Sequence, residues 1–300
     1  MEPSSRNSSL VVLWRILGND IVPRHAPGQT RQNLEFILRH EADFSGGEKR
    51  FLLNRIMDPA EVDKIRALLE RWQVRYDTIP FSREEYLAQR TVEERVRYIT
   101  NVNGARNHCI KVGLTLAPVV LPFDGNCFFT SAGWQSFFDI ANQNRDAAGF
   151  VVPLWRLRDN RQALRGSRKP QIKETIGRRF RIWPIRQLAE PQLGFTRSSD
   201  VRFDEELAYP RCDKAELLWR LGIPGPWQEW SSELRQQTAK RNGVSKYHGE
   251  LHFIPTAGFV CRLSSGNPRA DARMSFRVAA RRSGLGEITM LADKTCGRLS

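Results

Sequence analysis

The sequence lacks the short signatures of several familiar protein classes. It contains neither of the glycine-rich phosphate-binding patterns GxxxxGK(S/T) and GxGxxG, and it has no GxSxG motif of the serine hydrolases. Its five cysteines are scattered and form no CxxC pair, which argues against a zinc ribbon or a disulfide framework and indicates a reducing compartment. No apolar run approaches the roughly 18–20 residues of a membrane-spanning helix. We therefore expect a cytoplasmic protein.

Net charge is almost absent from the first half of the chain and concentrated in the second. The 300 residues include 47 Lys and Arg against 33 Asp and Glu, a net charge of +14. Residues 1–150 hold 19 basic and 18 acidic side chains, whereas residues 151–300 hold 28 and 15. A nucleic acid, an anionic membrane surface or a phosphate-bearing substrate would each explain a basic half. The 40% hydrophobic content is enough for a core and excludes a disordered basic tail.

Apolar runs alternate with helical periodicity along the first 157 residues. The predicted strands cover residues 10–17, 50–56, 72–79, 119–123 and 149–157. The predicted helices cover residues 30–40 with Thr30 as cap, 84–98, 103–116 and 131–142, and another begins at Asp58 and Pro59. Further along we predict a helix over 213–221, a strand over 253–263 and a terminal helix from 271. This order predicts an α/β fold, with a mostly parallel sheet flanked by helices.

Two motifs at the expected carboxyl edge of this sheet suggest chemistry, because ligands of open α/β sheets bind outside the carboxyl ends of the strands. Residues 103–107 begin a predicted helix, whose free N–H groups suit a diphosphate, and Arg106 adds a bidentate donor. Asp124 follows the strand at 119–123 and is positioned to hold a divalent cation that bridges two phosphates. Alternatively, Asn103 is a helix cap and Asp124-Gly125 an ordinary turn.

Taken together, these motifs resemble the glycosyltransferases of the GT-A (Rossmann-like) fold, most closely the bacterial group related to glycosyltransferase family 2. An Ala-Arg-Asn at a helix start, followed by an apolar strand into an Asp-x-Asp-like turn, is similar to that family over roughly residues 10–220. The resemblance implies a nucleotide-diphosphate sugar as donor and Mn²⁺ or Mg²⁺ at Asp124. The family's second aspartate is Asn126 here, which offers an oxygen ligand to the metal but no charge. The motif residues implied to bind the nucleotide sugar are Asn103, Arg106, Asn107, Asp124 and Gly125.

The resemblance implies roles for residues outside the two motifs as well. Asn19 and Asp20 follow the first predicted strand, and Asp77 lies near the end of the third. In the family these regions contact the nucleobase and the ribose; the alternative for Asn19 and Asp20 is a turn with a helix cap. In some glycosyltransferases a downstream histidine adds a metal or phosphate ligand, which makes His252 a candidate, although a pair of surface histidines, His248 and His252, is the main interpretation.

An inverting glycosyltransferase needs a carboxylate that deprotonates the acceptor hydroxyl. The family places this base at the start of a helix downstream of the metal motif, so Asp213 is the first candidate, Glu216 the second and Glu190 the third. Asp213 and Glu216 also fit a helix cap. Three tryptophans near this helix are candidates for an acceptor platform or for ordinary packing: Trp219, Trp227 and Trp230.

The sequence thus predicts a metal-assisted glycosyltransferase, hexosyltransferase-like, that acts in cell-surface polysaccharide or glycoconjugate synthesis on a saccharide or lipid-linked acceptor. We expect a disordered N-terminus over 1–9, a donor-binding half over 10–157, an acceptor-binding half over 158–230 with a basic flap at 158–182, and a C-terminal extension over 231–300 on the same domain. We expect the basic half to serve an anionic acceptor, a peripheral contact with the inner membrane face or a closing flap, and no nucleic acid. The alternative is a non-catalytic protein that binds nucleic acid or an anionic polymer.

Overall fold

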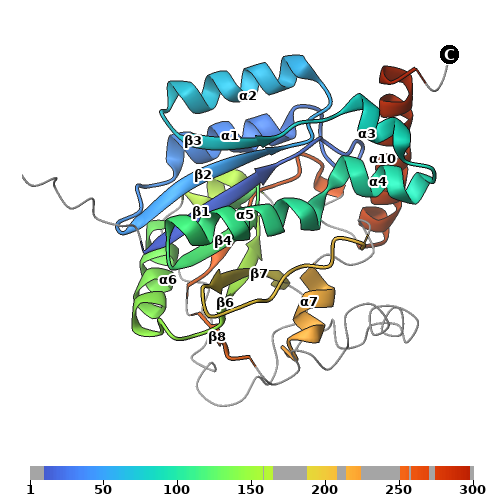
Figure 1. Cartoon of the computed structure of the whole chain (residues 1–300). Coiled ribbons are helices and arrows are strands. Elements are labelled where there is room, and N and C mark those ends of the chain that lie inside the picture. Colours follow the sequence, from blue (N-terminus) through green and yellow to red (C-terminus); the bar gives the residue numbers. More distant parts are fainter. Residues whose placement is uncertain are drawn as a thin grey trace, which may run out of the picture.

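In the described part of the computed structural model, nine strands form one mixed sheet with helices on both faces (Figure 1). The structure describes residues 10–157, 159–164, 188–207, 214–223, 251–256, 258–269 and 274–297. The strands are β1 (Val11–Leu17), β2 (Gly47–Asn54), β3 (Arg75–Ile79), β4 (Val119–Asp124), β5 (Cys127–Phe128), β6 (Gly149–Arg156), β7 (Leu188–Thr196), β8 (Phe253–Pro255) and β9 (Val260–Arg262). The helices are α1 (Gln29–His40), α2 (Pro59–Arg71), α3 (Arg83–Ala88), α4 (Val92–Thr100), α5 (Val102–Leu116), α6 (Ser131–Gln143), α7 (Lys214–Arg220) and α10 (Met274–Thr295), with a 3₁₀ turn at Asn160–Ala163.

The strand order is β3-β2-β1-β4-β7-β6-β9-β5, and β8 pairs with β6. Strand β1 pairs in parallel with β2 and β4, β2 with β3, and β6 with β8 and β9. Antiparallel pairings join β4 to β7, β6 to β7 and β5 to β9. The predicted α/β fold is therefore confirmed, with a sheet of mixed pairing.

Alternate side chains of β1 pack against helices on opposite faces of the sheet, as the pleat of a strand requires. Val12 and Trp14 belong to a buried cluster that includes α5 and α7, whereas Val11 and Leu13 belong to a cluster with α6. A third cluster packs α1 and α2 against β1 and β2. The strands between these layers are buried on both sides, which explains why β1 and β4 are continuous apolar runs.

Side-chain caps begin four of the described α-helices, α2, α3, α4 and α6. The side chain of Asp58 accepts a hydrogen bond from the backbone N of Ala60, and Pro59 begins α2, as predicted. The helix predicted over 84–98 is instead two helices, because Thr91 and Glu94 form a capping box that starts α4 anew. The predicted cap at Thr30 is wrong: Gly28, in the left-handed conformation at φ 76°, occupies the cap position of α1.

Strands from all three predicted segments of the chain share the one sheet. Strands β1 to β6 come from 10–157, β7 from 158–230, and β8 and β9 from 231–300, where one predicted strand is replaced by two. Helix α10 packs beside α4 (Figure 1). Residues 1–9 and most of the basic segment 158–182 lie outside the described residues. Within the described part of the chain, no helix combines the length and the apolar character that crossing a membrane requires.

Candidate functional site

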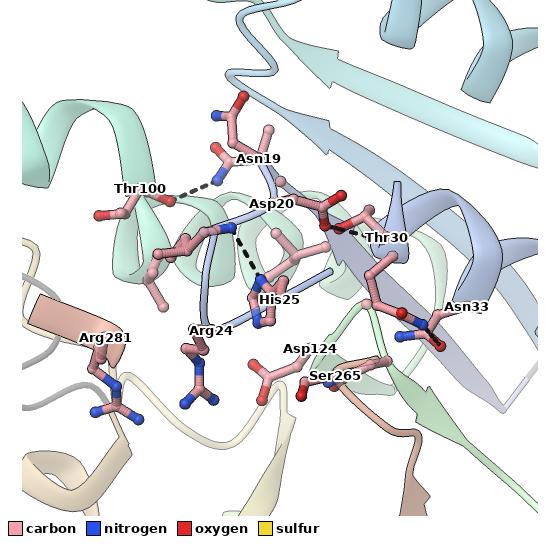
Figure 2. A pocket seen from close by; sticks show the side chains of 18 of the residues that line it. Asn19, Asp20, Arg24, His25, Thr30, Asn33, Thr100, Asp124, Ser265 and Arg281 are labelled. Atoms are coloured by element: carbon pink, nitrogen blue, oxygen red, sulfur yellow. Dashed lines mark hydrogen bonds between the residues drawn. The ribbon is translucent and has the colours of Figure 1, made fainter. Parts of the chain in front are cut away.

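A cavity of about 280 Å³ lies at the carboxyl ends of the strands that run parallel to β1 (Figure 2). The pairings give β1, β2, β4, β6 and β9 the same direction, so their carboxyl ends meet at one edge of the sheet. Helix α10 forms another part of the wall. The charged side chains that line the cavity are Asp20, Arg24, Arg106, Asp124, Arg156, Lys214, Arg262 and Arg281.

Asp124, the last residue of β4, is held by three donors. Arg106 Nη2 donates to Oδ1 at 2.8 Å, Lys214 Nζ to Oδ2 at 3.0 Å, and Gln192 Nε2 to Oδ2 at 3.1 Å. The Arg106 and Lys214 side chains are 1% and 5% exposed, whereas that of Asp124 is 28% exposed toward the cavity. Although burial opposes ionisation, Lys214, Arg106 and Arg262 hold the pKa of Asp124 well below its usual range. The carboxylate is therefore charged and already matched by two buried cations.

Arg106 lies in the first two turns of α5 and is positioned by its neighbours. Its Nη1 donates to Oδ1 of Asn103 at 3.1 Å, and its guanidinium carbon lies 5.1 Å from the ring centre of Phe203. Asn103 in turn donates to the backbone O of Asp204 at 2.7 Å. The helix cap is Asn101 rather than Asn103, so the buried Asn103 orients Arg106 toward Asp124.

Three arginines and a neutral histidine give the cavity its basic side. Burial, followed by the charges of Arg24, Arg262 and Arg281, lowers the pKa of His25 to about 3. Its Nδ1 accepts a hydrogen bond from the backbone N of Ile21 at 3.1 Å, which fixes the ring in the loop after β1. In Figure 2, Arg24 is drawn between this ring and Arg281. The imidazole therefore adds no charge of its own at neutral pH.

The loop after β1 contributes Asn19 and Asp20, whose side chains form hydrogen bonds with other residues of the protein. Thr30 donates to Oδ1 of Asp20 through its backbone N at 3.0 Å and its hydroxyl at 2.7 Å (Figure 2). Burial raises the pKa of Asp20 although these hydrogen bonds lower it. Asn19 donates to the backbone O of Arg55 at 2.7 Å and accepts from the backbone N of Met57 at 2.9 Å. Both residues line the cavity, and both also anchor this loop.

Gly125 and Asn126 form the tight turn between β4 and β5. A Cβ on Gly125 would lie 2.5 Å from the backbone O of Ile16, so only glycine lets the turn approach β1 this closely. Asp124-Gly125 can therefore be both the tight turn and part of the candidate site, the two alternatives that the sequence left open. Asn126 lines the cavity, and its buried Oδ1 has no hydrogen-bond partner among the described residues.

Asn103, although it supports Arg106, is not part of the cavity lining, and four further predicted site residues lie away from the cavity. Oδ2 of Asp77, on β3, lies 3.6 Å from Nε2 of His108, on α5. Asn107 is bonded to the backbone of Phe203, both as donor and as acceptor at 2.9 Å, so it fixes the segment that follows β7. Glu216 is fully buried and accepts from Arg220 at 2.6 Å and 3.1 Å.

His252, the fourth, is exposed and immediately precedes β8. Strand β8 pairs with β6 from Gly149 onward, which is the amino end of β6. The cavity lies at the carboxyl end of the same strand, about 20 Å away at the usual rise per residue. The structure therefore does not bring His252 to Asp124.

The remaining predictions concern residues of which the structure describes little. Asp213, Trp227 and Trp230 lie outside the described residues, and for Glu190 only the backbone within β7 is described. Trp219 is 8% exposed and packs in the core cluster of α7, which favours the packing interpretation over an acceptor platform.

The site also contains residues that the sequence did not single out. Lys214 follows the predicted Asp213, and Gln192 lies two residues after Glu190. Arg24, Arg156, Arg262 and Arg281 belong to no recognisable motif, because they meet only through the tertiary fold.

The arrangement around Asp124 does not fit a divalent cation. Mg²⁺ prefers six oxygen ligands, normally including one or two carboxylates that are free to bind it. Here the carboxylate of Asp124 bonds two cations and an amide, and the neutral Oδ1 of Asn126 is a single further oxygen. The metal stays a prediction from the resemblance that this geometry does not favour.

No protein-family model matches the chain, and a search of curated proteins finds no significant match.

Proposed function

We propose that the protein is a glycosyltransferase of the GT-A fold that binds a nucleotide-diphosphate sugar in this cavity and transfers the sugar to a saccharide or lipid-linked hydroxyl acceptor. One observation carries the proposal: among the described residues, six Lys and Arg side chains and two carboxylates line a cavity at the carboxyl ends of parallel strands. That edge is where open α/β sheets bind ligands, and a surplus of fixed cations suits a diphosphate.

The residues around the cavity suit different parts of such a donor. Arg106, Lys214 and Arg262 offer charged donors to the diphosphate. The loop residues Asn19 and Asp20, which also line the cavity, suit the polar edge of a base or the hydroxyls of a ribose. The unpartnered Oδ1 of Asn126 suits a donor group such as a sugar hydroxyl.

In the proposed reaction an oxygen of the acceptor hydroxyl attacks the anomeric carbon of the donor sugar. A new carbon–oxygen bond forms, and the bond from that carbon to the diphosphate oxygen breaks. The electron pair leaves with the nucleoside diphosphate, and the hydroxyl proton passes to a base. Fixed cations beside the diphosphate stabilise the charge that develops on the leaving group. Asp213 and Glu190 remain the candidate bases for inversion, whereas Glu216 is committed to Arg220.

A thermal-shift screen of nucleotide-diphosphate sugars, with EDTA and with Mn²⁺, tests the proposal. We expect at least one compound to raise the unfolding temperature, because a ligand that binds only the folded state stabilises it. Arg262→Gln should weaken this effect, since Arg262 lines the cavity. Arg145→Gln is the matched control, because Arg145 is exposed in the turn before β6 at the opposite edge. No stabilisation by any nucleotide would contradict the proposal, and tight, salt-sensitive binding of DNA or RNA would favour the alternative.

A further inference from the structure

Asp124, which was predicted to bind a metal, instead bonds two cationic side chains. Asp124 accepts hydrogen bonds from Arg106 at 2.8 Å and from Lys214 at 3.0 Å, and both cations are almost fully buried. Gln192, from the neighbouring strand β7, completes the set at 3.1 Å. A divalent cation at this carboxylate would have to displace two fixed cations or lie beside them, and like charges at such distances repel strongly.

The wider cavity strengthens this point. Among the described residues, its lining contains six cationic side chains and two carboxylates, those of Asp20 and Asp124. His25 adds no charge, because its pKa is about 3. A diphosphate carries two or more negative charges, which a group of fixed cations stabilises. A divalent cation would bring further positive charge to a place where these cations already lie.

We propose that this site binds its nucleoside diphosphate without a divalent cation: Lys214 and Arg106 take the place of the metal, and Asp124 is a positioning residue that holds both cations toward the cavity. The inference rests on the proposed function. It specifies which residues balance the negative charge of the nucleoside diphosphate when it leaves. Lys214 supplies a compact charge from the start of α7, and Arg106 a planar donor from α5. Both are held before any ligand arrives, so little reorganisation is needed on binding.

Calorimetric titration of the full-length protein with UDP, GDP, ADP and inorganic pyrophosphate, in excess EDTA and in millimolar Mg²⁺ or Mn²⁺, tests the inference. We expect the affinity of the best-binding probe in EDTA to lie within about threefold of its affinity with metal. Lys214→Met should lower that affinity by about tenfold or more, since one charge-assisted hydrogen bond is lost. Lys214→Arg should keep most of it. Lys111→Met, at an exposed position of α5, is the matched control and should change nothing.

Asp124→Asn distinguishes metal-free binding from metal-dependent binding even if Lys214→Met folds poorly. Without its carboxylate Lys214 and Arg106 are held less firmly but keep their charge, so pyrophosphate should still bind in EDTA. If Asp124 were a metal ligand, the same variant would lose binding. Binding by the wild type only when metal is present, or loss of pyrophosphate binding in Asp124→Asn, overturns the inference and leaves the proposed function standing. No binding of any probe under either condition overturns both.

Discussion

Replacing Asp124 by asparagine tests how strongly the fold depends on the charge at the end of β4. The variant keeps the size of the side chain but leaves Arg106 and Lys214, which are 1% and 5% exposed, without their carboxylate. Removing one partner of a buried ion pair costs about 3–5 kcal/mol, whereas an exposed pair contributes about 0–1 kcal/mol. Because Asp124 is 28% exposed, water in the cavity offsets part of the loss. We expect the free energy of unfolding at neutral pH to fall by about 2–3 kcal/mol.

The pH dependence of this difference separates lost charge from lost packing. Burial favours the neutral carboxyl, but Lys214 and Arg106 outweigh it and keep the pKa of Asp124 well below its usual range in the folded state. A lowered folded-state pKa stabilises the protein above the unfolded pKa of about 4, and this stabilisation is lost as the pH falls further toward the folded-state pKa. The gap between wild type and Asp124→Asn should therefore be constant from about pH 8 to about pH 5 and should shrink below about pH 4.

Urea denaturation followed by circular dichroism measures the gap at each pH, by linear extrapolation to zero denaturant. Asp139→Asn is the matched control, because Asp139 is exposed on α6 and its replacement should change the free energy of unfolding by less than about 0.5 kcal/mol. Wild-type stability of Asp124→Asn at neutral pH, or a gap that widens on acidification, would refute the reasoning.

Three further predictions follow from other contacts. Gly125→Ala should lower the free energy of unfolding by about 1–3 kcal/mol, because its Cβ would lie 2.5 Å from a backbone oxygen, whereas Gly286→Ala, in open space on α10, should raise it by about 0.5–1 kcal/mol in the same urea assay. By NMR, His25 should stay neutral down to about pH 5, since its folded-state pKa is about 3. Because the unfolded chain takes up the proton at higher pH than the folded protein, the contribution of His25 to stability falls as the pH drops below about 6.5. A titration midpoint near about pH 6.5 in the folded protein would contradict the burial argument. Arg95→Ala removes the ion pair with Asp293, at 2.9 Å, which holds α10 on α4; we expect a loss of about 2 kcal/mol and weaker nucleotide binding, and unchanged binding would show that the α10 wall of the cavity does not depend on this contact.

The parts of the fold that local sequence specifies are the parts that were predicted. Strands β1 and β4 are buried runs of apolar residues, and α2 carries its own cap in Asp58. Strand β7 was not predicted, because its pattern includes Pro191 and Gly194 and its place depends on pairing with β4 and β6. The two residues of β5 are too few to give a periodic signal. Tertiary pairing, rather than propensity, makes both of them strands.

The same division holds for the site. Asn19, Asp20 and Asp124 were predicted because each lies at or shortly after the carboxyl end of an apolar run, the edge where open α/β sheets bind ligands. Lys214 and Arg281 were not, since nothing near either residue in the sequence distinguishes it from other surface cations. Their role depends on where α7 and α10 dock, which only long-range packing determines.

The uneven distribution of charge along the chain takes on a different meaning in the folded protein. The nearly neutral first half was expected to hold the nucleotide site with one arginine and a metal, while the basic half served an acceptor, a membrane or a flap. In the cavity, both carboxylates come from the first half, but four of the six cations come from residues after 150: Arg156, Lys214, Arg262 and Arg281. Part of the excess charge of the second half therefore lines the same cavity as Asp124. A site built in this way gains its positive charge from the protein itself, so its affinity for a diphosphate should weaken with ionic strength in the wild type and less steeply in Lys214→Met, whether or not metal is added.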